Sequence, residues 1–236
     1  LFGSHAMQHV RGESLRGKRA VVSGAGNVAL YAAEKLIAHE AKVLTLSDSG
    51  GVLRIPKGLS QQDLEAIRAI KVEQRGRLSD VPAVVDGTEF VAKGSPWGEE
   101  CEMAFPCATQ NELDEADAHA LKGNGVQMVV EGANMPCTIK AAHVFRDAQI
   151  IFAPGKAANA GGVAVSGLEM AQNAGKNPWS RERTEKELES IMSDIHGRCI
   201  AEPTAQVPGG GVDYMRGANV AGFRRVADAM VSSGIV

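Results

Sequence analysis

Paired metal-ligand motifs are missing from this sequence of 236 residues. Its four cysteines, Cys101, Cys107, Cys137 and Cys199, form no Cys-x-x-Cys pair. His196 and Cys199 form a lone His-x-x-Cys, without a second pair at ligand spacing. We therefore interpret the cysteines as thiols in a reducing compartment, with a metal site as the alternative.

Long hydrophobic runs and an excess of one charge are also missing. No apolar run approaches the roughly 20 residues of a membrane span, so no membrane partner is expected. The formal net charge is -3, and the Lys and Arg residues are scattered, so no nucleic-acid partner is expected. No secretory segment is recognised, which favours a cytoplasmic location. The 44% hydrophobic and 22% charged content is typical of a globular protein with one large or two small domains.

The beginning of the chain differs from the rest. Leu1–Met7 contains a Gly-Ser-His string of the kind that cloning leaves in recombinant proteins. We therefore interpret residues 1–14 as a cloning remnant and lead-in outside the fold. Residues 15–236 are predicted to form the dinucleotide-binding domain.

The most informative segment is a glycine turn between a strand and a helix. Arg19–Ser23 is a short β-branched run, and the string Gly-Ala-Gly-Asn-Val-Ala follows it directly. Gly24 can take the backbone geometry of the turn, and Gly26 has no Cβ to block a phosphate. The first N–H groups of the following helix have no partner within the helix and can bind a pyrophosphate. The segment therefore predicts a dinucleotide site.

Strands and helices alternate along the chain. Strands are predicted at Arg19–Ser23, Lys42–Ser47, Glu89–Val91, Glu102–Phe105, Gln127–Val130 and Gln149–Ala153. Helices are predicted at Val28–His39, from Ser60 onward, and at Leu113–Leu121, Cys137–Phe145, Gly162–Gln172, Arg181–Glu202 and Asn219–Val231. Asp48–Gly51 is predicted to be a turn and Pro203–Gly211 a loop. This order predicts an α/β fold, Rossmann-like and doubly wound, with a mostly parallel sheet and additional C-terminal helices.

The end of the second predicted strand holds candidates for the adenosine end of a cofactor. Asp48 follows Gly26 by about 20 residues, where an acid normally accepts the ribose hydroxyls, and this favours NAD. Donors and positive charge for a 2′-phosphate are available at Ser47, Ser49, Lys71, Arg75 and Arg77. The basic residues can equally form a solvated face. The residues alone leave NAD and NADP both open.

Two later segments place Asn and Gly after predicted strands. They are Glu131–Pro136 and Pro154–Met170. Open α/β sheets bind ligands at this edge, and Asn159 is a candidate to bind a nicotinamide carboxamide. The Gly-Lys in the second segment is not a P-loop, because Ile150 stands where the first glycine belongs. Loop glycines with an Asn in a turn are the alternative interpretation.

Read together, these segments resemble the coenzyme domain of bacterial glutamate dehydrogenases. The segments that carry the resemblance are Gly24–Ala29, Pro106–Glu112, Glu131–Pro136 and Pro154–Gln172. The sequence is most similar to the NADP-dependent hexameric branch, in which the second strand also ends in Ser-Asp-Ser. The resemblance runs from about Leu15 to Val236.

The resemblance implies a role for each matching position. Those implied on the cofactor pyrophosphate are Gly24, Gly26, Asn27 and Val28. Those implied near the adenosine ribose are Ser47, Asp48 and Ser49, with Lys71 and Arg77 as candidates for the 2′-phosphate. Those implied along the ribose and nicotinamide are Thr109, Gln110, Asn134 and Asn159. Val163 and Ser166 are implied to face the glutamate side chain, with Ser166 bonding its γ-carboxylate.

Two positions depart from the family pattern. Cys137 stands where Thr is common, which affects packing. Gln74 and Arg75 do not reproduce the usual spacing of basic residues after Lys71, so the partners of the 2′-phosphate stay open.

The family's catalytic lysines and aspartate lie in an N-terminal domain that the resemblance does not cover. No catalytic residue is therefore predicted in this chain, which is expected to bind NADP but to oxidise little or no glutamate. The parent is expected to be a homohexamer that converts L-glutamate to 2-oxoglutarate and ammonia. Two alternatives are a leucine, valine or phenylalanine dehydrogenase, which Ser166 disfavours, and a nucleotide-binding module without catalysis.

Overall fold

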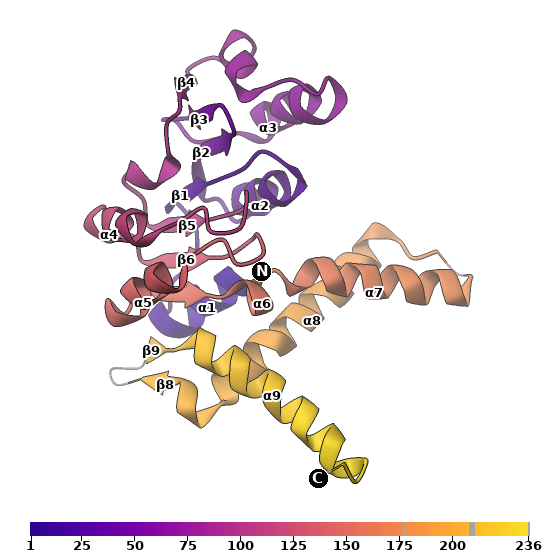
Figure 1. Cartoon of the computed structure of the whole chain (residues 1–236). Coiled ribbons are helices and arrows are strands. Elements are labelled where there is room, and N and C mark those ends of the chain that lie inside the picture. Colours follow the sequence, from indigo (N-terminus) through magenta and orange to yellow (C-terminus); the bar gives the residue numbers. More distant parts are fainter. Residues whose placement is uncertain (177, 208–210, 236) are drawn as a thin grey trace.

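A seven-stranded sheet forms the centre of the computed structural model, which describes residues 1–176, 178–207 and 211–235 (Figure 1). The strand order is β4-β3-β2-β1-β5-β6-β7. The parallel strands are β1 (Arg19–Val22), β2 (Lys42–Asp48), β5 (Met103–Phe105), β6 (Met128–Val130) and β7 (Ile151–Ala153). At one edge, β3 (Gly51–Arg54) and β4 (Glu89–Ala92) pair antiparallel. The prediction of an α/β fold with a mostly parallel sheet is confirmed.

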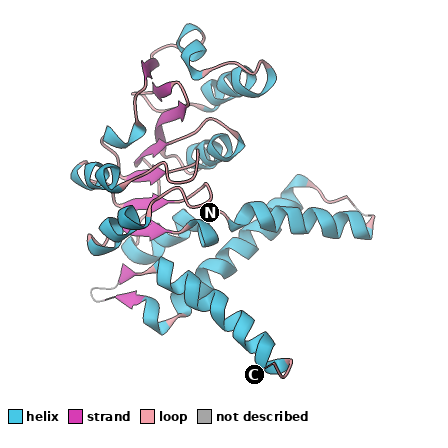
Figure 2. Cartoon of the chain, in the orientation of Figure 1, coloured by secondary structure: helices cyan, strands magenta, loops and turns pink. Residues whose placement is uncertain are grey.

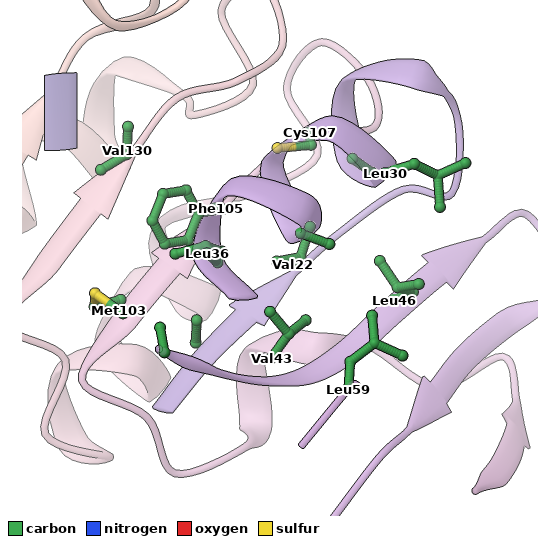
Figure 3. Close-up of a cluster of buried hydrophobic side chains, with 14 of the residues drawn as sticks. Val22, Leu30, Leu36, Val43, Leu46, Leu59, Met103, Phe105, Cys107 and Val130 are labelled. Carbon is green, nitrogen blue, oxygen red and sulfur yellow. The ribbon is translucent and has the colours of Figure 1, made fainter. Parts of the chain in front are cut away.

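Helices cover both faces of the sheet (Figure 2). One layer contains α1 (Phe2–Arg11), α2 (Asn27–Ala38), α3 (Gln61–Arg68) and α8 (Arg181–Ala201). The opposite layer contains α4 (Glu115–Gly123) and α5 (Ile139–Asp147). Because side chains alternate along a strand, Val22 joins the first core and Val21 the second. Figure 3 shows the first core, where Val22, Leu30 and Phe105 lie among other apolar side chains.

The last part of the chain is helical, as predicted. A short helix α6 (Gly155–Ala158) leads into α7 (Ala160–Gly175), and α9 (Tyr214–Ser232) packs against α8. α7 extends away from the sheet and has no buried residue (Figure 1). Among the described residues, no helix is long and apolar enough to cross a membrane.

Helix starts follow their sequence signals. The predicted start at Ser60 is confirmed, because Ser60 Oγ accepts the N–H of Asp63 at 3.1 Å. The Asp63 carboxylate accepts the N–H of Ser60 at 3.2 Å in return. In α4, the cap is Asp114, so Leu113 lies before the helix rather than inside it as predicted.

Two short hairpins were not predicted. Asp48–Gly51 is the tip of a hairpin in which β3 pairs with β2, and Asp48 lies opposite Gly51. The run after this turn is too short to stand out as a strand in the sequence. The predicted loop Pro203–Gly211 contains β8 (Gln206–Val207), which pairs with β9 (Gly211–Val212). Residues 208–210 of this loop lie outside the described part of the chain.

The expectation that the first residues lie outside the fold is wrong. Phe2, Ala6 and Met7 of α1 are buried in the first core, with Phe2 only 2% exposed. The glycine of the Gly-Ser-His string is also packed, because a Cβ on Gly3 would lie 2.9 Å from Val130 Cγ2. Sequence reasoning gave weight to the resemblance to a cloning remnant and missed the spacing of the apolar residues.

Three histidines meet where α1 packs against α8. The rings of His5 and His9 each lie 5.7 Å from the ring of His196, measured between centroids. His196 Nε2 lies 2.9 Å from the hydroxyl of Tyr214 on α9. Burial, and then positive charge at His5 and His9, lower the pKa of His196 to about 4. Burial is also the main reason that the pKa of His5 is lowered.

Lowering the pH from 7.5 to 5 is expected to destabilise the fold through His196. Its pKa of about 4 lies below the ordinary 6.5, so the unfolded chain binds the proton first as the pH falls. The free energy of unfolding should therefore fall by up to about 2 kcal/mol as the pH drops below 6.5. Urea unfolding at both pH values measures this. His196→Gln should reduce the pH dependence and the exposed His119→Gln should not; equal slopes in both variants would contradict the prediction.

Candidate functional site

The site lies at the carboxyl ends of β1 and β5. On one side of this pair successive strands are added outward through β2, and on the other side through β6 and β7. β1 pairs with β2 on one side and with β5 on the other. Such a point in an open α/β sheet leaves a crevice between the loops that follow the two strands. The loops are in contact here, because Ser23 Oγ accepts the N–H of Cys107 at 2.8 Å.

The glycine turn has the geometry that a phosphate site requires. Gly24 has φ +83, and a Cβ there would lie 3.0 Å from Cys107 O. A Cβ on Gly26, in contrast, would meet no heavy atom within 4 Å. α2 begins at Asn27 without a side-chain cap, and Asn27 and Val28 are exposed. The first N–H groups of α2 therefore have no side-chain acceptor and lie next to open space.

Ser47 lies behind this turn rather than in the crevice. Its hydroxyl accepts the N–H of Gly24 at 2.9 Å, and the residue is only 8% exposed. Ser49, two residues later, is exposed. The two serines that the resemblance implies near the ribose thus occupy different environments.

Asp48 and Lys71 are brought together from distant segments. Lys71 Nζ lies 3.3 Å from Asp48 Oδ2, which also accepts the N–H of Leu78 at 3.0 Å. Oδ1 of Asp48 accepts the N–H of Gly50 at 2.9 Å. Burial alone would raise the pKa of Asp48, but the bonds from Leu78, Gly50 and Lys71 together lower it. Asp48 is therefore an ionised carboxylate whose two oxygens are engaged within the chain.

Arg77 lies next to this pair. Its neighbour Leu78 donates to Asp48, while Arg77 itself is exposed. The structure thus places Asp48, Lys71 and Arg77 at one end of the crevice.

The loop after β5 contains Thr109 and Gln110, which are both exposed. Glu112 holds this loop, since its Oε1 accepts the N–H groups of Ala108 at 2.8 Å and Thr109 at 3.3 Å. Burial raises the pKa of Glu112, while hydrogen bonds from Ser23 and from the two N–H groups oppose the rise. The Glu112 carboxylate therefore fixes the backbone of this loop.

Asn134 and Asn159 come from different loops and touch. Asn159 Nδ2 donates to Asn134 Oδ1 at 2.9 Å and to Ala133 O at 3.1 Å. Both loops follow strands of the parallel part of the sheet, β6 and β7. The two asparagines that the resemblance assigns to the nicotinamide end thus lie side by side.

Val163 and Ser166 lie on the first turns of α7. Val163 is 78% exposed, and the Ser166 hydroxyl donates only to the carbonyl of Gly162 on its own helix, at 3.3 Å. Both side chains are therefore exposed at the side of the crevice where Asn159 ends α6.

A cavity of about 400 Å³ adjoins the asparagine side of the crevice. Its walls come from α1, α2, α8 and the start of α7, and Asn159 and Gly132 lie along its lining. Within the part of the chain that the structure describes, no group of three or more His, Cys, Asp or Glu side chains is placed to hold a metal ion.

A family model described as Glutamate/Leucine/Phenylalanine/Valine dehydrogenase matches residues 1–234. The chain belongs to this family. The match includes α1, so the helix taken for a cloning remnant lies within the family domain.

Individual members of the dehydrogenase family are similar along nearly the whole chain. The NAD(P)-specific glutamate dehydrogenase of Xylanibacter ruminicola is 48% identical over 97% of this chain and 51% of its own length. The NADP-specific glutamate dehydrogenase of Escherichia coli K12 is 45% identical over 100% of this chain and 52% of its own. A crystal structure of Plasmodium falciparum glutamate dehydrogenase superposes with a TM-score of 0.93 at 40% identity, over 98% of this chain and 50% of that one. The chain thus spans about half the length of the curated relatives it matches.

Sequence reasoning missed two carboxylates of the candidate site, the half-buried Glu112 and the buried Glu131. Glu112 and Glu131 hold backbone N–H groups of the loops that line the crevice. An acid directly after the buried strand β6 was a usable signal for Glu131, because an unpaired buried carboxylate is costly. Its N–H partners, Cys137 and Gly155, depend on how the two loops fold and could not be named from the sequence.

Gly26→Val is expected to abolish dinucleotide binding and to leave the fold intact. The valine side chain would enter the open space beside the N-terminus of α2, where a pyrophosphate has to lie. Because Gly26 has φ -87, an L-residue fits its backbone. Fluorescence titration with NADPH tests binding, and circular dichroism tests the fold. A folded variant that still binds NADPH would remove this placement of the site.

Proposed function

We propose that this chain is the cofactor-binding half of an NADP-dependent glutamate dehydrogenase. Residues 15–236 form its Rossmann-like dinucleotide-binding domain, and α1 packs onto that domain. The observation that carries the proposal is the open N-terminus of α2 behind Gly26. The names of the Escherichia coli and Xylanibacter ruminicola relatives support the substrate and the cofactor.

The pyrophosphate of the cofactor is assigned to the glycine turn. Gly24 brings the turn close to the loop after β5, and Gly26 leaves room for the phosphates. The N–H groups of Asn27 and Val28 would donate to the phosphate oxygens, and the positive end of the helix dipole would favour the negative charge.

The adenosine end is assigned to the second strand and to the segment that folds over it. The oxygens of Asp48 already accept hydrogen bonds from Gly50, Leu78 and Lys71, so they are poorly available for ribose hydroxyls. Lys71 offsets the charge of Asp48, while Ser49 and Arg77 are exposed beside it. This arrangement suits a 2′-phosphate better than a bare ribose, which favours NADP over NAD.

NADPH is expected to bind more tightly than NADH, by roughly tenfold or more, because only NADPH carries the 2′-phosphate. Lys71→Met should reduce NADPH affinity by a similar factor and change NADH affinity little. Fluorescence titrations with both cofactors measure the ratio, and Lys122→Met on α4 serves as the control. Equal affinities in the unsubstituted chain would rule out the NADP assignment.

The nicotinamide and substrate ends are assigned to the loops after β5, β6 and β7. Thr109 and Gln110 line the ribose, and Asn134 and Asn159 bind the carboxamide. Bound NADP would supply the acceptor for the hydride from the Cα of the amino acid. Val163 and Ser166 face the glutamate side chain. The exposed hydroxyl of Ser166 can turn from the Gly162 carbonyl to donate to a carboxylate, which favours glutamate over the apolar side chains of leucine or valine.

Proton transfer is assigned to the other half of the proposed parent enzyme, which corresponds to the half of the relatives that this chain does not match. Oxidative deamination needs a base near the amine and groups that stabilise the developing charge. Lys156 lies in a ligand-facing segment, but its amino group donates to Asn219 Oδ1 on α9. That contact gives Lys156 a supporting role for the loop.

We assign the protein to the reducing cytoplasm, which suits its four free cysteines, all of them buried.

Exposed apolar side chains mark the surface that the other half would cover. Val163 and Met170 on α7 and Phe223 and Val226 on α9 are all more than half exposed. Patches of this kind are unusual on a protein that works as a monomer. We assign them to contacts within the parent enzyme, which is proposed to be a homohexamer.

This chain alone is expected to oxidise glutamate at no measurable rate, because the proposal places the proton-transfer groups in the other half. Absorbance of NADPH at saturating glutamate and NADP measures turnover. NADPH titration of the same preparation shows that its cofactor site is intact. Clear turnover by a preparation free of host dehydrogenase would locate a base within residues 1–236 and refute this division of labour.

A further inference from the structure

Glu131 is a buried carboxylate at the junction of the loops that follow β6 and β7. It comes directly after β6 and is only 6% exposed. Its Oε2 accepts the N–H of Gly155 at 2.6 Å, and its Oε1 accepts the N–H of Cys137 at 3.2 Å. One side chain therefore connects the start of α6 with the far end of its own loop.

The Cys137 thiol adds a third donor. Burial, and then the charge and hydrogen bond of Glu131, raise the pKa of this thiol far above its ordinary value. Cys137 therefore stays protonated and can donate to the carboxylate.

The loop that Glu131 holds includes Asn159. α6 is only four residues long, and the N–H of Asn159 donates to the carbonyl of Gly155 at 2.9 Å. The packing has little free space, because a Cβ on Gly155 would lie 3.1 Å from Ala133 O and 3.3 Å from Glu131 Oε2. A shift of Gly155 would therefore displace Asn159 and its hydrogen bonds to Ala133 and Asn134.

We propose that Glu131 is a positioning residue that sets the nicotinamide end of the cofactor site through Gly155 and Asn159. This inference rests on the proposed function, which assigns Asn134 and Asn159 to the carboxamide. Glu131 acts through the backbone: it holds the N–H groups of Cys137 and Gly155, and so fixes the two loops that carry the asparagines. The adenosine end lies across the sheet, at β2, and does not depend on this carboxylate.

Glu131→Gln tests the proposal with little change of shape. A carboxylate accepts at both oxygens, whereas an amide carries one oxygen and one NH2 group. In the variant, the NH2 group has to face the N–H of either Gly155 or Cys137, and one buried donor loses its acceptor. The loops then separate at one of the two contacts.

The experiment compares NADPH with 2′-phospho-ADP-ribose, which lacks the nicotinamide. Glu131→Gln should weaken NADPH binding by roughly tenfold and leave binding of 2′-phospho-ADP-ribose within about twofold. The gain in dihydronicotinamide fluorescence when NADPH binds should also be smaller in this variant. Glu115→Gln, an exposed acid on α4, is the matched control and should change neither affinity.

Other outcomes overturn the inference. Equal losses for both ligands would show that Glu131 supports the fold in general, and no loss would show that it positions nothing. If Glu131→Gln does not fold, Glu131→Asp keeps the charge but is too short for both N–H groups, and the same selective loss is expected. If neither variant folds, the positioning role is rejected. An unsubstituted chain that binds neither ligand would instead refute the proposed function.

Discussion

The close contact between the glycine turn and the loop after β5 is the constraint on which the rest of the site depends. A Cβ on Gly24 would lie only 3.0 Å from Cys107 O, and the positive φ of Gly24 disfavours any other residue; its N–H donates to the hydroxyl of Ser47. The contact directs the chain into α2 with the first N–H groups of the helix exposed. Without it, the sheet would keep its core but lose the opening at its carboxyl edge.

Polar side chains that are buried or half-buried give this edge its shape. The buried Ser23 and the half-buried Glu112 hold the loop after β5, while the buried Glu131 connects the loops after β6 and β7. In a low-dielectric interior, such groups are costly unless they are fully paired, so they favour one arrangement of the loops strongly. The exposed residues of the site are therefore positioned by the polar side chains that hold their loops.

Much of this architecture could be predicted because it depends on local patterns. The glycine turn, the capping box at Ser60 and the short apolar strands each have a signal within a few residues. The contact of Asn134 with Asn159 was not predicted from spacing; the resemblance implied only a shared role. β3 was missed because pairing with β2 defines it, whereas α1 had a local signal in the helical spacing of its apolar residues. The partners of Glu131 are set by tertiary contacts that no local pattern records.

The hydrogen bond between Lys156 and Asn219 connects α6 with α9, the last helix of the chain. Lys156 lies on α6, next to the residue that Glu131 holds, and Asn219 lies on α9. The last helix of the chain, although remote in sequence from the glycine turn, thus reaches the loop that carries Asn159 through one exposed hydrogen bond.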